Sequence, residues 1–554
     1  MNSKRLLFNE LMQFQGSIMK RECQKCSAPA SFTCQNCAQT HYCDRNHQRE
    51  DWPKHKLHCA PILVAHNDTL GRHLIAARPL RQGELLLRER PLVAGPRVGS
   101  TPVCVSCYRT LPGPRPRLCG RCGGAWVCGA PCEGGAHAAE CAALRGRNVA
   151  VNAQWVLPLR CYLGVKGLKV DPEPDTRWQD VLGLETHEKE RRGSVRWSVI
   201  QRFVVQELQE AGVISNDAEL MHKLCSIIDV NSFEIRGPEN ASGRAERLKG
   251  IYLKASLMSH SCVPNTHLAV SNDFQLILRA AVPVEKGEII SFNYTGPIKS
   301  TTERQDMLSE EKYFLCRCER CLDPTELGTH MNSLNCPACH KDGILTKHET
   351  EWTCSNCSKT LKDDVVRTTI FEARRVLDTL DLQNQRALET VLARFSRTFH
   401  PNHAIMIDLK QMLIERYRSH LLVEIKPCKK LLRKKIELCR QILPVIRLIE
   451  PGISRLRGLT LYAFHLSIVL LGNREFEARE ITRKELISKL EEAEAFLKEA
   501  VFHLSYEPKD SPEGILFQQA ETALKCLQET ITEYQEDERA QEHRNKGIRR
   551  GKRR

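Results

Sequence analysis

The sequence predicts an α+β protein of several domains, in which small metal-binding modules interrupt a β-rich region and an all-helical part follows. Three observations carry this prediction. Pairs of cysteine and histidine recur in two blocks near the N-terminus. Two stretches with strand-like patterns, 66–97 and 251–295, flank a segment of mostly helical pattern. From about residue 363 to 540, apolar residues recur every three or four positions, as on one face of a helix.

Length and composition are those of a soluble protein with several domains. The chain has 554 residues, of which 41% are hydrophobic and 27% charged. We expect no membrane span, since no run of 18 apolar residues occurs and the first residues lack the pattern of a signal peptide. Cysteine pairs without a secretory signal favour a reducing compartment, so nucleus and cytoplasm are expected. The net charge of +15 is spread thinly, which argues against direct DNA binding.

The two cysteine blocks repeat one order of ligands. About one C-x2-C pair is expected by chance at this cysteine content, and the chain carries seven. Each block offers eight ligands, enough for two tetrahedral zinc sites of the structural kind. We expect interleaved sites, the first pair joining the third and the second joining the fourth. The first block has Cys23, Cys26, Cys34, Cys37, Cys43, His47, His55 and Cys59; the second has Cys104, Cys107, Cys119, Cys122, Cys128, Cys132, His137 and Cys141.

Two further cysteine groups follow the second β-like stretch. The first is a C-x-C-x2-C group, and the second is a pair of C-x2-C motifs whose spacing is typical of a zinc ribbon. We interpret the ribbon as a structural clip to the helical part. With these groups the chain has ligands for about six Zn²⁺ ions. The group members are Cys316, Cys318 and Cys321, then Cys336, Cys339, Cys354 and Cys357.

The first block resembles the MYND finger. The segment from Tyr42 to Cys59, with Gln48, Asp51 and Trp52, matches the closing helix of that family, although His47 stands where the family has Cys. This resemblance implies that the first finger binds proline-rich peptides of corepressors. The second block keeps the ligands but lacks the Gln and Asp-Trp residues, so only its fold is implied.

Together with these fingers, a second motif resembles the SET- and MYND-domain protein-lysine methyltransferases, most like the arthropod-type branch. The motif is the phrase 259–265 (SHSCVPN), then Asn293-Tyr294, then Phe314 ahead of the C-x-C-x2-C group. The resemblance implies a β-rich SET fold split by a MYND finger, an additional N-terminal finger and a TPR-like helical C-terminal domain. The implied segments are a leader at 1–22, a MYND-type finger at 23–59, the SET N-terminal part at 66–103, a second MYND-like finger at 104–141, a helical insert at 145–250, the SET core at 251–295, a post-SET zinc segment at 296–325, a zinc ribbon at 336–357, the helical C-terminal domain at 363–540 and a basic tail at 541–554.

The resemblance also implies roles for single residues. S-adenosyl-L-methionine would lie against Gly71, Arg72, His73, Leu74, Ser259, His260 and Phe314. A protein lysine would enter a channel lined by Phe233, Tyr294 and Tyr313, with Tyr294 as the catalytic residue that orients the amine. Cys262 would join Cys316, Cys318 and Cys321 around a zinc ion.

Three positions depart from the family pattern and leave two functions open. The family has Asn at Ser259, Gly at His73 and an aromatic residue at Lys312, whose place Tyr313 could take. The first reading is a protein-lysine N-methyltransferase, acting on histone or non-histone substrates in transcriptional regulation. The second is a SET/MYND adaptor with little or no catalysis that recruits corepressors through its first finger.

Overall fold

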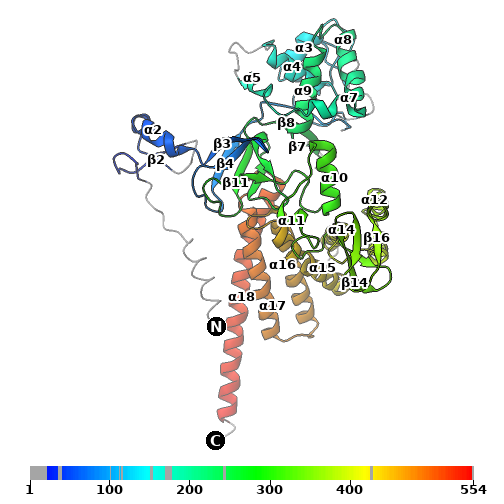
Figure 1. Ribbon diagram of the computed structural model, residues 1–554. Helices are drawn as coiled ribbons and strands as arrows, with labels where there is room; N and C mark the ends of the chain where they lie inside the picture. The colour runs from blue at the N-terminus through cyan, green and yellow to red at the C-terminus, as the bar shows by residue number, and fades with distance from the viewer. Residues whose placement is uncertain are drawn as a thin grey trace.

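The computed structural model describes residues 22–34, 40–99, 102–111, 113, 116–149, 154–168, 177–240, 245–423 and 428–551. A β-rich core lies at the centre of the molecule, with a helical lobe on one side and the C-terminal helices on the other (Figure 1). The first zinc finger projects beside the core, and the last helix extends well beyond the neighbouring helices. The expected leader, residues 1–22, lies almost entirely outside the described residues.

The N-terminal finger is a small hairpin packed on one helix. Strands β1 (Phe32–Thr33) and β2 (His41–Tyr42) pair antiparallel, and α2 (Arg45–Cys59) follows. Asp44 caps α2, because its carboxylate accepts the backbone N–H of His47 at 2.8 Å. Asp51 of α2 accepts the hydroxyl of the buried Tyr42 at 2.7 Å, which fixes the helix on the hairpin.

The β-rich core consists of short strands in several small sheets. β3 (Ile62–Asn67) pairs with β4 (Gly71–Ala76), and β5 (Leu85–Glu89) pairs with β11 (Leu276–Ala280), which pairs with β10 (Thr266–Val270). These strands confirm the two predicted β-like stretches. A third sheet has the order β6-β8-β7, with β6 spanning Val93–Pro96. One buried cluster, which includes Leu74, Leu86, Leu248 and Leu278, joins these sheets.

The similar sequences at 81–84 and 285–288 form the same turn. Glu84 accepts the N–H of Arg81, and Glu288 accepts the N–H of Glu285, each at 3.0 Å. Both glycines of these turns have positive φ, +81° at Gly83 and +84° at Gly287, a conformation that side chains disfavour. The residues just before the two turns, Leu80 and Val284, pair with each other. The two β-rich stretches of the core are therefore in contact next to these two turns.

The segment between the two halves carries the second finger and a helical lobe. The finger includes η1 (Ala130–Glu133) and α3 (Ala138–Leu144). The lobe consists of α4 (Val156–Val165), α5 (Arg177–Val181), α6 (Glu188–Arg191), α7 (Val195–Ile200), the π-helical turn η2 (Gln201–Gln206), α8 (Glu207–Glu210) and α9 (Ala218–Asn231). Finger and lobe share one hydrophobic cluster. Arg160 of α4 fixes them together, because it donates to the Val105 carbonyl at 2.5 Å and pairs with the buried Glu140.

The prediction that the helical insert reaches residue 250 was wrong for its last part. Residues 233–239 and 245–251 form the antiparallel strands β7 (Phe233–Glu239) and β8 (Ala245–Ile251). Ile235 and Leu248 pair across the two strands and are buried in the core, while Arg236 and Arg247 face outward. Alternation of apolar and polar residues is the period of a strand, and burial of one face against the β-rich core selects it over a helix.

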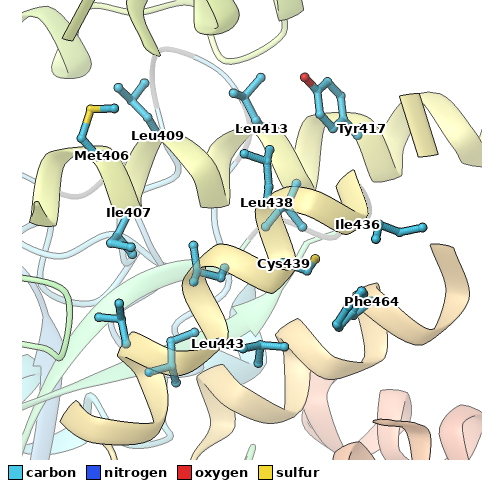
Figure 2. Packing of buried hydrophobic residues seen from close by; sticks show 14 of the residues in the cluster. Met406, Ile407, Leu409, Leu413, Tyr417, Ile436, Leu438, Cys439, Leu443 and Phe464 are labelled. Atoms are coloured by element: carbon cyan, nitrogen blue, oxygen red, sulfur yellow. The ribbon is translucent and has the colours of Figure 1, made fainter. Parts of the chain in front are cut away.

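The C-terminal part is all-helical, as predicted. Its helices are α12 (Asp363–Asp378), α13 (Gln385–Phe395), α14 (Ala404–Val423), α15 (Lys429–Ile449), α16 (Arg455–Glu477), α17 (Arg483–Leu504) and α18 (Pro512–Gly551). From α13 onward each helix packs on the next along the chain. Figure 2 shows the centre of their core, where Leu413 of α14, Leu443 of α15 and Phe464 of α16 are all buried. Most of the expected basic tail lies within the last turns of α18.

Two smaller features complete the fold. The zinc ribbon is a sheet of the order β13-β14-β15-β16, with bounds Leu334–Cys336, His340–His348, Glu351–Cys354 and Thr360–Lys362. Its Trp352 is buried in the core of the C-terminal helices and donates to Asp363 of α12 at 2.9 Å. The ribbon is therefore part of the helical domain. Across the described helices, none combines the length and apolar character needed to cross a bilayer.

Candidate functional site

Two short segments lie side by side at the centre of the core, at a point that we call the crossing. β9 (Ser259–His260) pairs in parallel with β12 (Ser291–Phe292). Asn265 holds the crossing together: its amide donates to the Ile289 carbonyl at 2.8 Å, and its side-chain oxygen accepts the Ser291 N–H at 2.9 Å. Asn265 is the last residue of the 259–265 phrase, but sequence reasoning assigned it no role.

The crossing brings His260, Tyr294 and Phe314 together. The Tyr294 N–H donates to Nδ1 of His260 at 3.1 Å, and the ring of His260 lies 5.1 Å from that of Tyr294 and 6.0 Å from that of Phe314. Burial lowers the pKa of His260 to about 4, so the imidazole is neutral at pH 7. Phe314 is 38% exposed, so part of this side chain is accessible to a ligand.

The segment Gly71–Leu74 lies beside the crossing, as the resemblance implied. The Ile290 N–H donates to the Leu74 carbonyl at 2.9 Å, and the Ser259 N–H donates to the Ile290 carbonyl at 3.2 Å. Gly71 adopts φ +61° with open space where a Cβ would stand. His73 is buried, and its Nδ1 contacts the Gly71 carbonyl at 3.0 Å. The departure at His73 is therefore accommodated within its own strand.

A cavity of about 720 Å³ lies next to Tyr294; we call it the aromatic cavity after the rings of Phe233, Phe292 and Tyr294, and charged side chains such as Asp229, Lys249 and Glu311 line it too. Phe233, Phe292, Tyr294 and Lys312 line it, whereas His260 and Phe314 are not among its lining residues. Tyr294 therefore stands between the His260–Phe314 group and the cavity. Its hydroxyl donates to the Met258 carbonyl, and burial raises its pKa. The cavity thus brings together Phe233 and Tyr294, two residues of the predicted channel.

Tyr313 does not join Phe233 and Tyr294 in lining this cavity. Its backbone has φ +60° where it ends α10 (Thr301–Lys312), and its ring lies 5.1 Å from that of His187 in the helical lobe. The left-handed residue turns the chain away from the helix axis, so adjacent side chains diverge. Lys312, and not Tyr313, faces the cavity.

The predicted zinc ligands gather in five sets of four, and the ligand atoms within each set lie within 4.8 Å of one another. Measured sulfur–sulfur distances are 3.4 to 3.8 Å. Four sulfurs at the usual Zn–S length of about 2.3 Å stand about 3.8 Å apart, so the sets fit a tetrahedral zinc ion. The sets are Cys23, Cys26, Cys43 and His47; Cys104, Cys107, Cys128 and Cys132; Cys119, Cys122, His137 and Cys141; Cys262, Cys316, Cys318 and Cys321; and Cys336, Cys339, Cys354 and Cys357.

These sets confirm the interleaved pairing in the second finger and in half of the first. For the other half, the sulfurs of Cys34 and Cys59 lie 3.5 Å apart and His55 is buried, while Cys37 lies outside the described residues. In the ribbon, a Cβ on Gly343 would stand 2.6 Å from the sulfur of Cys354. Only glycine permits this approach of the backbone to the ligands.

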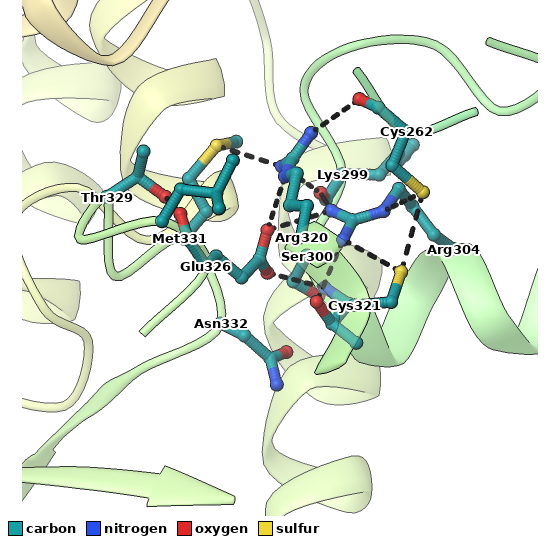
Figure 3. Close-up of polar contacts among 12 residues, drawn as sticks. Cys262, Lys299, Ser300, Arg304, Arg320, Cys321, Glu326, Thr329, Met331 and Asn332 are labelled. Atoms are coloured by element: carbon teal, nitrogen blue, oxygen red, sulfur yellow. Dashed lines mark hydrogen bonds and ion pairs between the residues drawn. The ribbon is translucent and has the colours of Figure 1, made fainter. Parts of the chain in front are cut away.

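A buried ionic cluster supports the zinc set nearest the crossing (Figure 3). Glu326 accepts from Arg304 at 2.9 Å and from Arg320 at 2.7 Å, and the three side chains are at most 1% exposed. Burial alone would raise the pKa of Glu326, but the two guanidinium groups hold it below its usual value. Arg304 also donates to the sulfur of Cys262 at 3.1 Å. Sequence reasoning missed this cluster.

Comparison with known proteins agrees with this geometry. The MYND finger family matches residues 23–59, and the SET domain family matches residues 71–295. The chain therefore contains one segment that matches the MYND finger family and one that matches the SET domain family. The crossing of β9 and β12 and the second finger lie within the residues that match the SET domain, whereas the aromatic cavity is also lined by Glu311 and Lys312, beyond them.

Several curated proteins are similar to part of this chain. "SET domain-containing protein SmydA-8, isoform A" of Drosophila melanogaster is 28% identical over 309 residues, 53% of this chain and 64% of that protein. "Histone-lysine N-methyltransferase ASHR1" of Arabidopsis thaliana is 25% identical over 78% of this chain and 96% of its own length. "Histone-lysine N-methyltransferase SMYD3" of Mus musculus is 31% identical, with 45% and 59% covered. The chain thus spans a little under two thirds of the Drosophila relative.

Among solved structures, the "Crystal structure of the SET domain of LSMT bound to Lysine and AdoHcy" aligns with 87% of this chain and 92% of that chain. The sequence identity is 12% and the TM-score is 0.27. At this level the SET assignment rests on the family match and on the curated relatives.

Proposed function

We propose that this protein is a protein-lysine N-methyltransferase that uses S-adenosylmethionine and acts in transcriptional regulation, in the nucleus and cytoplasm. One observation carries the proposal: Tyr294 stands between the His260–Phe314 group and an aromatic cavity. A donor bound on one side and an acceptor on the other would meet only at Tyr294. The names of the Arabidopsis and mouse relatives support the same reaction class, with histone or non-histone proteins as substrates.

The residues on the first side suit a cofactor with a planar base and a charged sulfur. Phe314 offers a partly exposed aromatic ring for the adenine. His260 is neutral and so adds no positive charge that would repel a sulfonium. The backbone of Gly71–Leu74 beside the crossing completes the binding surface. When bound there, S-adenosylmethionine supplies the methyl group.

The residues on the cavity side of Tyr294 favour loss of a proton from the acceptor amine and orient its nitrogen. A lysine with a pKa of about 10.4 must lose a proton before it can attack, and an aromatic, poorly hydrated channel lowers that pKa. The Tyr294 hydroxyl already donates its hydrogen bond to the Met258 carbonyl. Its oxygen is therefore free to accept an N–H of the amine, which aims the nitrogen lone pair away from Tyr294 and along the transfer direction.

Calorimetric titration of the purified full chain with S-adenosylmethionine tests the cofactor side. We expect wild-type protein to bind it and His260→Ala to lose at least about tenfold in affinity, since about 1.4 kcal/mol of contact energy is worth tenfold. His66→Ala, an exposed histidine on β3, is the matched control and should bind like wild type. No binding to wild type at millimolar cofactor would favour the adaptor function.

The adaptor function has an observation of its own, in the first finger. A groove of about 460 Å³ lies between its hairpin and α2, where Phe32 is 41% exposed and Trp52 is 39% exposed. Exposed aromatic faces beside a groove are the surfaces on which polyproline segments dock. We propose that this groove binds proline-rich partner peptides, whether or not the SET domain is active.

A fluorescence titration with a proline-rich peptide tests the groove. Trp52→Ala should weaken binding by about 2 kcal/mol, roughly 30-fold, because a central aromatic residue carries a large share of such contacts. Phe371→Ala removes another exposed aromatic ring, on α12, and should leave binding unchanged. Equal affinity of the two variants would exclude the groove as the binding site.

A further inference from the structure

Lys312 lies in the aromatic cavity, where an acceptor lysine would have to enter. Its ammonium is 5.5 Å from the centre of the Tyr294 ring and donates to the Val230 carbonyl. Val230, Phe233, Phe292 and Tyr294 line the same cavity. A cation near an aromatic face and a carbonyl oxygen is the arrangement that such a channel offers to a lysine side chain.

We propose that Lys312 occupies the acceptor channel with its own ammonium, so that an external lysine enters only after Lys312 loses its proton or withdraws. This inference rests on the proposed function and adds an occupant to the same site. Two ammonium groups in one aromatic cavity repel each other strongly, because the surrounding dielectric is low. The charged Lys312 therefore keeps an external lysine ammonium out of the cavity until Lys312 is neutral or displaced.

The position of Lys312 is fixed by its helix. It is the last residue of α10, and the left-handed Tyr313 that follows ends the helix there. The capping box at the start of α10, formed by Ser300 and Glu303, holds the other end. Because both ends of α10 are fixed, the position of Lys312 at the cavity is fixed as well.

The surroundings of Lys312 lower its pKa, so its ammonium can lose a proton slightly above neutral pH. Burial, which Glu311 and Asp229 oppose and Lys249 and Arg196 reinforce, lowers the pKa of Lys312 to about 8. As pH rises from 7 to 9, Lys312 therefore changes from mostly charged to mostly neutral. Asp229 is shared, since it also pairs with Arg191, Arg196 and Lys249.

Binding of n-butylammonium, a probe of the lysine side chain, tests the inference without any methyl transfer. Ligand-observed NMR titration is carried out on the full chain saturated with S-adenosylhomocysteine, at pH 7 and pH 9, where the probe stays protonated because its pKa is close to that of lysine. We expect Lys312→Met to bind the probe at least tenfold more tightly than wild type at pH 7. Wild type should approach the variant at pH 9.

Two further variants separate occupancy from other effects. Lys312→Arg keeps the charge and cannot lose its proton in this range, so it should bind weakly at both pH values. Lys249→Met removes one charge from the wall of the same cavity and should change the affinity little. Equal probe affinity in wild type and Lys312→Met, an equal gain in Lys249→Met, or no binding to any variant would overturn the inference. Failure of the proposed function would show separately, as absence of cofactor binding to wild type.

Discussion

Replacing Glu326 by Gln is expected to lower the free energy of unfolding of the SET region by about 3–5 kcal/mol, as is typical when one partner of a buried ion pair is removed. The substitution keeps the size of the side chain but removes its charge. Arg304 and Arg320 would then be two fully buried cations facing each other without a carboxylate. Because Arg304 also touches the sulfur of Cys262, the zinc set beside the crossing should loosen with it.

Urea unfolding followed by tryptophan fluorescence, together with zinc content after dialysis, measures both effects. Glu319→Gln is the matched control, since Glu319 lies seven residues earlier on an exposed position of α11 (Glu319–Leu322). The control should unfold at the urea concentration of wild type. If Glu326→Gln and Glu319→Gln unfold together, the ionic cluster does not stabilise the region as described.

Replacing Tyr294 by Phe is expected to slow methyl transfer by about 10²-fold or more, the usual penalty for a misplaced reacting group. The ring, and with it the packing on His260, is retained. What is lost is the hydroxyl that donates to the Met258 carbonyl and leaves its oxygen to orient the amine. Cofactor affinity should therefore stay close to wild type, which separates a loss of orientation from a loss of folding.

The rate of label transfer from S-adenosylmethionine to lysate proteins, at saturating cofactor, measures this effect. Tyr534→Phe removes a hydroxyl from α18 and is expected to transfer at the wild-type rate. A Tyr294→Phe protein that transfers methyl groups as fast as wild type would remove Tyr294 from the mechanism.

The zinc sets could be predicted from the sequence because their signal is local. A ligand pair such as Cys336 and Cys339 is confined to two residue types at one spacing, and each pair needs a second pair to complete a tetrahedron. The crossing that holds His260 next to Tyr294 has no such local signal. The resemblance of the 259–265 phrase to a known family pointed to His260 and Tyr294, but not to the hydrogen bond between them.

Other parts of the site depend on tertiary packing and carried no readable signal. Arg304, Arg320 and Glu326 stand among many charged residues, and nothing in the sequence marks them as buried. The choice between Lys312 and Tyr313 depends on the left-handed residue that ends α10. The hairpin at 233–251 did have a signal, the alternation around Ile235, but helical patterns on its N-terminal side obscured it.

The most direct test of the proposed methyl transfer is incubation of the purified wild-type chain with labelled S-adenosylmethionine and a whole-cell lysate, followed by identification of the labelled residue. The arrangement of His260 and Phe314 on one side of Tyr294, and of the aromatic cavity on the other, predicts label on lysine nitrogen of one or more lysate proteins. A chain that holds its zinc and binds the cofactor, yet labels no lysine at any pH between 7 and 9, would contradict it.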